Sequence, residues 1–358
     1  MLPLAGCNVL ELAPWRPGPH AGRLLVDLGA DVVKVEPPGG DPMRAYPRLF
    51  RELAAGKRSR VLDLKDPDDR AACIDLASDA HVVLEGFRPG VADRLGVGYD
   101  ALRAVQPGVV YVSVSGFGAD GPLAQAPGHD VNYLAWAGAL WRRDGSGPVE
   151  PAFPAADLAA GSCAALAAVA GYVGWLKTGE GGHVDLAMTD VLATWAGLPG
   201  VNATSDSTVE QPGLCSYGVF PVADGWIALG ITTEDRFWRS LCEAVGLGEL
   251  AGVAFADRVA RTRELRPVVG AALADHRRDD LVARLLAADV PVAPVLSNEE
   301  AAALPHLRER GTVVTDGDDL ALGSVLRLPG VAAGAPPPAP DLDAHRGQRF
   351  RQELGFGS

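Results

Sequence analysis

The sequence predicts an α/β protein: an open, Rossmann-like parallel sheet in a large domain, followed by a smaller α+β domain. Two observations predict it. In the first third of the chain, short β-branched runs alternate with segments of helical spacing, as parallel strands and their crossover helices do. Further on, a connection rich in Gly, Pro, Ser and Thr (residues 198–216) marks a change in composition. The 358 residues are enough for one large or two ordinary domains.

Apolar periodicity locates the elements of the large domain in order. Strands are expected at 8–12, 31–35, 60–64, 81–85, 109–114 and 183–187, and helices at 21–28, 66–77, 99–105, from 132 onward and at 158–176. Pro14, Pro17, Gly18 and Pro19 predict a loop after the first strand. No Gly-x-Gly-x-x-Gly follows that strand, so the sequence gives no support for dinucleotide binding.

The predicted domains are 1–198, the large domain, and 217–311, the small one, with a C-terminal segment at 312–358. In the small domain we expect strands at 226–230 and 290–295 and helices at 236–245 and 281–288. The tail is rich in proline and poor in core residues.

Composition narrows the class of protein. A net charge of −13 argues against non-specific nucleic-acid binding, which needs clustered Lys and Arg. The five cysteines form no CxxC pair, which predicts reduced thiols in a cytoplasmic protein. No signal peptide is expected at the start, and the apolar run 158–176, interrupted by glycines, is interpreted as a core helix and not a membrane span.

Two acidic residues and a histidine fall at predicted helix starts. His129 and Asp130 follow Gly128 at a loop-to-helix junction, and Asp157 precedes the apolar run that begins at Leu158. A carboxylate in the first turn of a helix is stabilised by free backbone N–H groups, and such residues are usually caps. The residues alone therefore leave both a capping role and a catalytic role open.

The same stretch, Gly-His-Asp-Val-Asn-Tyr at 128–133, resembles the active-site region of the 2-methylacyl-CoA racemases. These belong to the family III CoA-transferase superfamily, also called the CaiB/BaiF type. Other segments resemble that superfamily in the same order along the chain, and together they cover about residues 6–300. They are residues 28–41, 56–59 (Gly-Lys-Arg-Ser), 62–65, 87–90 (Phe-Arg-Pro-Gly), 115–118 and 223–226.

The resemblance implies a racemase of 2-methylacyl-CoA thioesters. Inversion next to a thioester needs a base on each face of the α-carbon, and His129 and Asp157 resemble that pair. Asp130 is expected to help polarise the thioester. Glu234 resembles the acid that orients the histidine, although the spacing also allows Asp235. No metal or redox cofactor is implied, and coenzyme A enters only as part of the substrate.

The resemblance also implies the contacts to coenzyme A. Lys57, Arg58 and Arg88 stand where the family has residues near the CoA phosphates, and loop cations at strand ends suit that task. Gly128, Asn132 and Tyr133 are expected to line the substrate.

The sequence departs from the family pattern at two positions on the nucleotide side. Pro37 and Ala54 stand where many relatives have Arg and Asn. One nucleotide contact is then either lost or supplied elsewhere, for example by Arg44 or Arg48.

The family implies a homodimer of interlocked rings whose tail returns to the large domain. It also leaves two other functions open. In a family III CoA-transferase, the carboxylate at Asp157 attacks the thioester and forms a covalent intermediate. A non-catalytic CoA-binding relative would keep Arg88 and lose the catalytic residues. The acyl group is not readable from the sequence.

Overall fold

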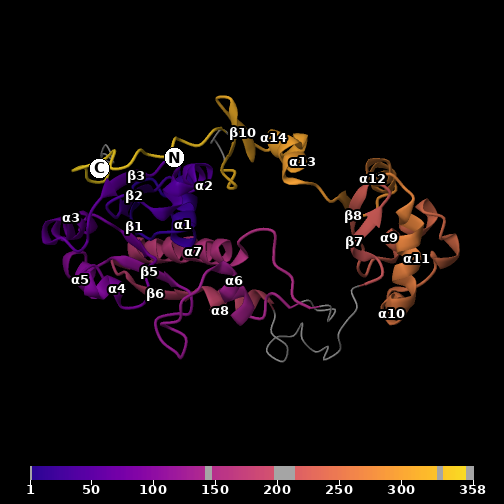
Figure 1. Ribbon diagram of the computed structural model, residues 1–358, viewed down its shortest axis with the longest axis horizontal. Helices are drawn as coiled ribbons and strands as arrows, with labels where there is room; N and C mark the ends of the chain where they lie inside the picture. Colours follow the sequence, from indigo (N-terminus) through magenta and orange to yellow (C-terminus); the bar gives the residue numbers. More distant parts are fainter. Residues whose placement is uncertain (1, 142–146, 197–213, 329–333, 352–358) are drawn as a thin grey trace. The chain divides into compact units, whose positions relative to one another are not determined.

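The computed structural model describes residues 2–141, 147–196, 214–328 and 334–351. The chain divides into two compact units, which Figure 1 shows by sequence colour. The first comprises Met1–Leu140, Val149–Ala203 and Pro305–Ser358, and the second Trp141–Pro148 and Thr204–Leu304. The C-terminal segment thus joins the first unit from residue 305, not 312. Most of the predicted connection at 198–216 lies outside the described residues.

A six-stranded sheet of order β3-β2-β1-β4-β5-β6 forms the centre of the first unit, and every neighbouring pair is parallel. Its strands are β1 (Asn8–Leu12), β2 (Asp31–Glu36), β3 (Arg58–Val61), β4 (Val82–Glu85), β5 (Val110–Ser115) and β6 (Gly182–Ala187). The predicted open parallel sheet is confirmed. Since β1 lies centrally and the chain winds outward from it in both directions, ligands of such a sheet bind beyond the strand carboxyl ends.

Crossover helices connect these strands. They are α1 (Pro17–Asp27), α2 (Pro47–Ala54) after a short 3₁₀ turn η1 (Pro42–Ala45), α3 (Pro67–Ala77), α4 (Val91–Arg94), α5 (Tyr99–Val105), α6 (Asp130–Trp136) and α7 (Ala155–Thr178). Helix α8 (Met188–Ala196) follows the last strand, β6. The prediction of a loop through Pro19 was wrong, because α1 already begins at Pro17, where a proline in the first turn loses no hydrogen bond. The third strand begins at Arg58 and not at Arg60, and α2 and α8 were not predicted.

Helices α1 and α7 cover one face of the sheet. Their contact is close because α7 is rich in small residues: a Cβ added at Gly161 would lie 2.5 Å from the carbonyl oxygen of Pro17. Valines of β4 and β5 and alanines of α7 form the buried core between the sheet and these helices. Helix α7 is long and apolar enough to span a membrane by length and composition, and its alanine-rich face packs in this core.

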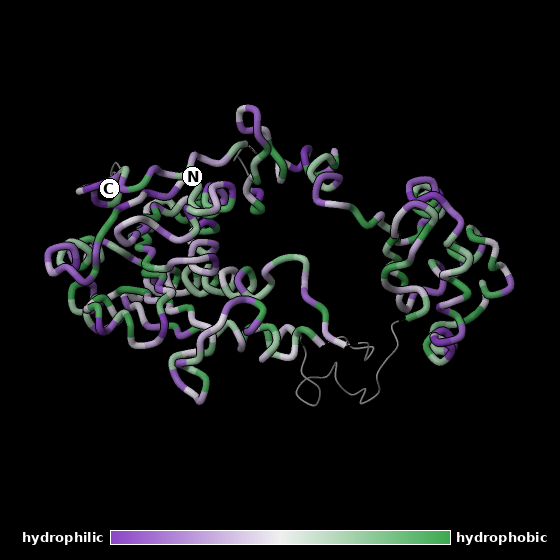
Figure 2. The backbone as a smooth tube through the Cα atoms, in the orientation of Figure 1, coloured by the Kyte–Doolittle hydropathy of each residue, from purple (hydrophilic) through white to green (hydrophobic). Residues whose placement is uncertain are grey.

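The opposite face of the sheet packs against α3 and α5. Leu10, Val33 and Tyr111 point to this side and join Leu76 and Leu102 in a second buried cluster. Figure 2 shows hydrophilic residues along α3, and the start of this helix carries the exposed Asp68 and the half-buried Asp69.

The C-terminal segment attaches to the free edge of β3. The Ser59 N–H donates to His345 Nδ1 over 3.2 Å, and the His345 N–H donates to the Ser59 carbonyl over 3.0 Å. The Val61 N–H donates to Asp343 Oδ1 over 2.9 Å. Because these bonds occupy the donors of an edge strand, the segment protects that edge from pairing with another chain.

The second unit is a small α+β body. Its antiparallel sheet has the order β7-β8-β9, with β7 (Tyr217–Val222), β8 (Gly225–Gly230) and β9 (Val292–Pro294). Helices α9 (Asp235–Ala244), α10 (Phe255–Ala260), α11 (Thr262–Ala274), α12 (Arg278–Ala287) and α13 (Asn298–Ala303) accompany it, with a 3₁₀ turn η3 (Gly248–Leu250). Trp238 is fully buried in its core. Strand β7 and helices α10 and α11 were not predicted.

Candidate active site

The starts of helices α6 and α7 lie together in the first unit. Asp157 is the third residue of α7, so its N–H is one of the free donors of the first turn. That N–H donates to Asp130 Oδ1 over 3.0 Å, and Asp130 is the first residue of α6. The Asp130 carboxylate therefore caps the neighbouring helix and fixes the two helix starts, and the two acids, beside one another.

His129 stands at the N-cap of α6 with an extended backbone, and its side chain is exposed. Its N–H donates to Asn132 Oδ1 over 3.0 Å, which closes the start of the helix. The indole of Trp15 meets the imidazole edge to face, with ring centroids 5.8 Å apart. The imidazole is thus exposed at the protein surface and contacts an aromatic ring there.

The side chain of Tyr133 packs beside these residues. Its hydroxyl donates to the Gly128 carbonyl over 2.5 Å, and its ring meets Phe117 edge to face at 5.3 Å. A Cβ at Gly116 would lie 2.3 Å from the ring, and one at Gly128 would lie 2.7 Å from it. Glycine is required at both positions because the ring fills that space, so the motif's Gly128 and Tyr133 act as one packing unit.

The electrostatics of the site single out Asp157. Burial, together with the negative charge of Asp130, raises the pKa of Asp157 to about 6, and Arg16 opposes the rise. Burial and the charge of Asp157 also raise the pKa of Tyr133, while Arg88 lowers it. A carboxyl group with a pKa near neutrality can accept and return a proton at working pH, which an ordinary surface aspartate does poorly.

Arg88 lies where the sequence predicted, in the turn after β4 at the carboxyl edge of the sheet. Its side chain is exposed, and its charge acts on Tyr133. The cation is therefore near the site and open to an anionic ligand.

Lys57 and Arg58 do not behave as predicted. Lys57 is buried, and its ammonium donates to Glu11 Oε2 over 2.6 Å and to the Pro19 carbonyl over 2.7 Å. Arg58 is also buried, and it donates to the Arg349 carbonyl over 2.5 Å. Since both groups are used in internal contacts, this geometry does not support their binding of phosphate, and that role stays a prediction.

Lys57 belongs to a buried charge cluster at the carboxyl ends of β1 and β2, which we call the ion cluster: Glu11, Lys34, Asp41 and Lys57. Lys34 contacts Glu11 at 2.9 Å and Asp41 at 2.6 Å. Although burial opposes it, the two lysines hold the pKa of Glu11 below its usual range. Burial lowers the pKa of Lys57 to about 8, and Glu11 opposes that shift. Every member of the cluster is paired.

Arg44 is also committed internally. It donates to Glu36 Oε2 over 2.6 Å and to Glu36 Oε1 over 2.7 Å, a bidentate pair. It does not replace the nucleotide contact that Pro37 leaves open. Arg48 is exposed at the start of α2 and keeps that possibility.

Glu234 lies in the second unit, at the N-cap of α9. Its carboxylate accepts from the Thr232 N–H over 3.1 Å and from the Thr232 hydroxyl over 3.0 Å. The alternative, Asp235, contacts the buried Arg258 at 2.5 Å. A role of either acid as the partner of His129 stays a prediction.

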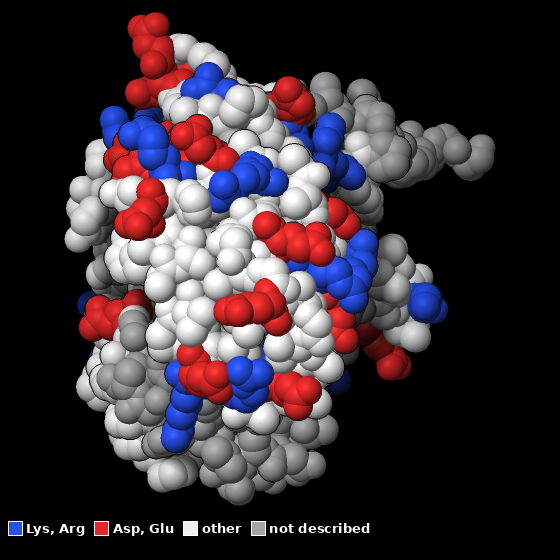
Figure 3. Space-filling model, turned by 90° about the vertical axis from the view of Figure 1, so that its right-hand side faces the viewer, with Lys and Arg blue, Asp and Glu red and all other residues white. Residues whose placement is uncertain are grey.

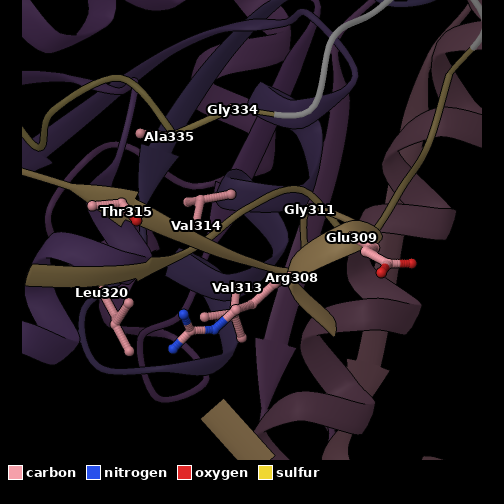
Figure 4. Close-up of a pocket in the computed structure, with 9 residues that line it drawn as sticks. All are labelled: Arg308, Glu309, Gly311, Val313, Val314, Thr315, Leu320, Gly334 and Ala335. Carbon is pink, nitrogen blue, oxygen red and sulfur yellow. The ribbon is translucent and has the colours of Figure 1, made fainter. Parts of the chain in front are cut away.

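A pocket of about 480 Å³ lies elsewhere in the first unit, at the hairpin of β10 (Val313–Asp316) and β11 (Asp319–Leu322), next to α14 (Pro305–Glu309). Figure 4 shows its lining, in which Arg308, Glu309 and Thr315 supply the polar groups. None of the predicted site residues lines it. On the face shown in Figure 3, blue and red side chains alternate and form no single basic patch. Among the residues that the structure describes, no three His, Cys, Asp or Glu gather as a metal site.

Sequence reasoning missed Trp15 and Arg16, in the loop between β1 and α1. Trp15 contacts His129, and the charge of Arg16 acts on Asp157. The one signal that could have found them is position, because this loop follows the central strand at the carboxyl edge of the sheet.

A family model described as CoA-transferase family III matches residues 4–346. The chain is 32% identical to succinate–glutarate CoA-transferase of Agrobacterium fabrum, covering 97% of this chain and 94% of that protein. It is 31% identical to acetyl-CoA:oxalate CoA-transferase of Acetobacter aceti, over 98% and 96% of the two chains. It is also 32% identical to the alpha-methylacyl-CoA racemase of Homo sapiens, over 87% and 82%.

Solved structures agree with these similarities. A CaiB/BaiF family protein from Brucella suis superposes with a TM-score of 0.84 at 28% identity, covering 96% of this chain and 97% of that one. Rv3272 from Mycobacterium tuberculosis gives the same TM-score and identity, with coverage of 96% and 98%. The match extends over both units of the chain.

Proposed function

The chain belongs to CoA-transferase family III, and from that premise we propose that it is a racemase of 2-methylacyl-CoA thioesters. His129 and Asp157 are the two bases in this proposal. One removes the α-proton, the electron pair moves into the thioester as an enolate, and the conjugate acid of the other returns a proton to the opposite face. The reaction needs no metal or redox cofactor, and coenzyme A enters as part of the substrate.

The observation that carries the proposal is the 3.0 Å hydrogen bond from the Asp157 N–H to Asp130. It ties the start of α7 to the start of α6, and His129 is the residue just before α6. A second link supports the same arrangement, because the consecutive residues Trp15 and Arg16 act on His129 and Asp157 respectively. The two bases are therefore neighbours of one short loop, as groups that flank a single carbon must be.

The other site residues receive roles from their surroundings. Asp130 holds the Asp157 backbone and raises its proton affinity, and free N–H groups at the two helix starts suit the enolate oxygen. Tyr133, Gly128 and Asn132 shape the wall next to the thioester. Arg88, exposed and near Tyr133, binds the phosphates of CoA.

The proposed assembly is a homodimer in the cytoplasm. Large apolar side chains are exposed on the helices of the site: Trp136 at 64%, Leu166 at 69% and Trp195 at 64%. A surface of this kind is more typical of a subunit interface than of a free face. In the proposal a second copy of the chain covers it. Glu234 or Asp235 would orient His129 in that assembly.

Incubation of one enantiomer of a 2-methylacyl-CoA in D₂O, with no acceptor acid, tests the proposal. Deuterium is expected at the α-carbon together with loss of stereochemical purity, both followed by NMR. His129→Ala should abolish inversion while leaving CoA affinity near that of the unchanged protein. Unchanged turnover in that variant would refute the assignment.

CoA transfer is the second candidate, and the identity to two CoA-transferases over nearly the whole chain favours it. Asp157 would attack the thioester and release the CoA thiolate, which then displaces the acyl carboxylate to leave an aspartyl-CoA thioester. Movement of CoA to an added carboxylic acid, with a CoA adduct on Asp157 by mass spectrometry and no α-exchange, would establish it instead.

A further inference from the structure

The loop between β1 and α1 reaches both proposed bases with consecutive side chains. Trp15 precedes Arg16, the N-cap of α1. The indole lies against the imidazole of His129, with centroids 5.8 Å apart and planes inclined by 74°. Trp15 has a φ of 65°, the left-handed region that a bulky residue rarely adopts. The loop thus holds a strained backbone at the point where it meets the site.

The start of α1 lies over the same face of α7 that carries Asp157. Gly161 is four residues beyond Asp157, so the two share a face of the helix. A Cβ at Gly161 would lie 2.5 Å from the Pro17 carbonyl oxygen and 2.9 Å from the His20 ring. Ser162 Oγ lies 3.4 Å from His20 Nε2. Arg16, one residue before Pro17, is therefore next to the first turn of α7.

The charged and titratable groups around Asp157 come from two neighbouring elements. Helix α6 brings Asp130 and Tyr133, and the start of α1 brings Arg16 and His20. Burial, Lys57 and Arg16 lower the pKa of His20. Strand β5 and helix α8, which also pack on α7, bring no group that shifts the pKa of Asp157.

Arg16 is the cation of this group. Its side chain forms no direct ion pair with a carboxylate of the described part of the chain. Burial raises the pKa of Asp157, and the positive charge of Arg16 opposes that rise at longer range. The same charge also opposes the rise that burial causes in the pKa of a second acid, Glu52. The charge of the guanidinium thus acts on both Asp157 and Glu52.

We infer that Trp15 and Arg16 are positioning residues of the proposed pair of bases. Arg16 favours the charged form of Asp157 against the repulsion of Asp130, and Trp15 fixes the imidazole of His129 in one orientation. The inference rests on the proposed function for the role of the two bases. It goes beyond that function because it assigns a task to a loop outside the Gly-His-Asp motif.

Titration of the Asp157 carboxyl tests the part of Arg16 without any turnover. Aspartate labelled with ¹³C at the carboxyl would be followed by NMR in the full chain, with Asp157→Asn used to assign the signal. In Arg16→Gln the pKa of Asp157 should rise by about one unit, since a cation near a carboxylate lowers its pKa by about 1 to 3 units. Arg16→Lys should restore most of the shift.

Lys177→Gln is the matched control, because it removes one positive charge from the exposed far end of the same helix. It should leave the titration unmoved. An unmoved titration in Arg16→Gln, or an equal shift in Lys177→Gln, would overturn the role of Arg16. If α-exchange is never seen but the titration moves as expected, the proposed function fails, and only the effect of Arg16 on the Asp157 carboxyl stands.

Trp15→Gly tests the second residue, with Trp15→Phe as the conservative variant. Glycine adopts a positive φ without strain, so the backbone of the loop is compatible with the substitution. The rate of α-deuterium exchange should fall about tenfold, because the imidazole loses its aromatic contact. Trp15→Phe should keep most of the rate. Exchange at the original rate in a folded Trp15→Gly protein would overturn the role of Trp15.

Discussion

The first unit holds two groups of charged residues at the carboxyl edge of its sheet, and the two groups differ in how completely their charges are paired. In the ion cluster every charge is buried and meets an opposite charge: Lys34 and Lys57 share Glu11. At the starts of α6 and α7, two acids lie together beside an exposed histidine whose ring contacts Trp15. Complete pairing serves stability, whereas incomplete pairing leaves groups that can exchange protons with a ligand.

The contrast has a direct consequence for substitution. Removing a charge from the ion cluster leaves its partner buried and alone, which lowers stability. Removing Asp157 relieves a charge that its surroundings disfavour, which raises stability and abolishes function. Loss of one ionisable group should therefore lower the stability of the fold when it occurs in the ion cluster and raise it when it occurs at Asp157.

Asp157→Asn should give the largest effect. We expect the rate of inversion at the α-carbon to fall by about 10³-fold or more, because a proton-transfer group typically contributes 10² to 10⁴. The measurement is the loss of stereochemical purity of a single enantiomer of a 2-methylacyl-CoA. A variant that binds CoA normally and still inverts the centre within tenfold of the original rate would contradict the role of Asp157.

The same substitution should stabilise the fold in a defined pH window. The folded pKa of Asp157 is raised to about 6, so its ionisation costs stability above that pH and nothing below the unfolded value of about 4. We therefore expect Asp157→Asn to raise the free energy of unfolding by about 1–2 kcal/mol at pH 7.5, with the gain vanishing near pH 4. Urea denaturation across this range measures it. A gain independent of pH would point to packing instead.

Lys57→Met should have the reverse effect. It leaves Glu11 buried with Lys34 as its only cation in the ion cluster, and loss of one partner of a buried pair typically costs about 3–5 kcal/mol. The KM for an acyl-CoA should stay unchanged in the protein that remains folded. The double variant Glu11→Gln/Lys57→Met should recover part of the loss. A raised KM for acyl-CoA with normal stability would instead indicate that Lys57 binds a phosphate of CoA.

Arg88→Gln should act on binding alone. Because Arg88 is exposed after β4, its loss should raise the KM for acyl-CoA about tenfold with little change in kcat, the pattern of a uniform binding contact. Arg94→Gln, an exposed arginine of the next helix, serves as the control. Equal effects of the two would indicate general attraction of an anion.

The smallest effects separate Glu234 from Asp235. Asp235→Asn should lower stability by about 1–3 kcal/mol, because it weakens the pairing of the buried Arg258. Glu234→Gln should leave stability nearly unchanged and lower exchange about tenfold, since a carboxylate on the histidine raises its basicity. If Asp235→Asn lowers exchange more than its loss of stability explains, Asp235 is the partner.

The sequence predicted the parts of this picture that depend on local pattern. Alternating strands and helices predicted the sheet, and the glycine before His129 predicted the loop-to-helix junction. The exposure of individual side chains could not be predicted from local pattern. Lys57 and Arg58 have the sequence context of loop cations, and only the tertiary structure shows that α1 and the C-terminal segment cover them. The start of α1 could not be predicted from the sequence, because prolines are common both in loops and in the first turn of a helix. Trp15 and Arg16 carry no motif at all.

Exchange resolved by enantiomer tests the two-base site most directly. Each enantiomer of a 2-methylacyl-CoA would be incubated in D₂O with His129→Ala and with Asp157→Asn. Each variant should fail to invert the centre, yet the remaining base should still exchange the α-proton of one enantiomer, a different one for each variant. Loss of exchange from both enantiomers in Asp157→Asn, with His129→Ala still inverting the centre, would contradict the account.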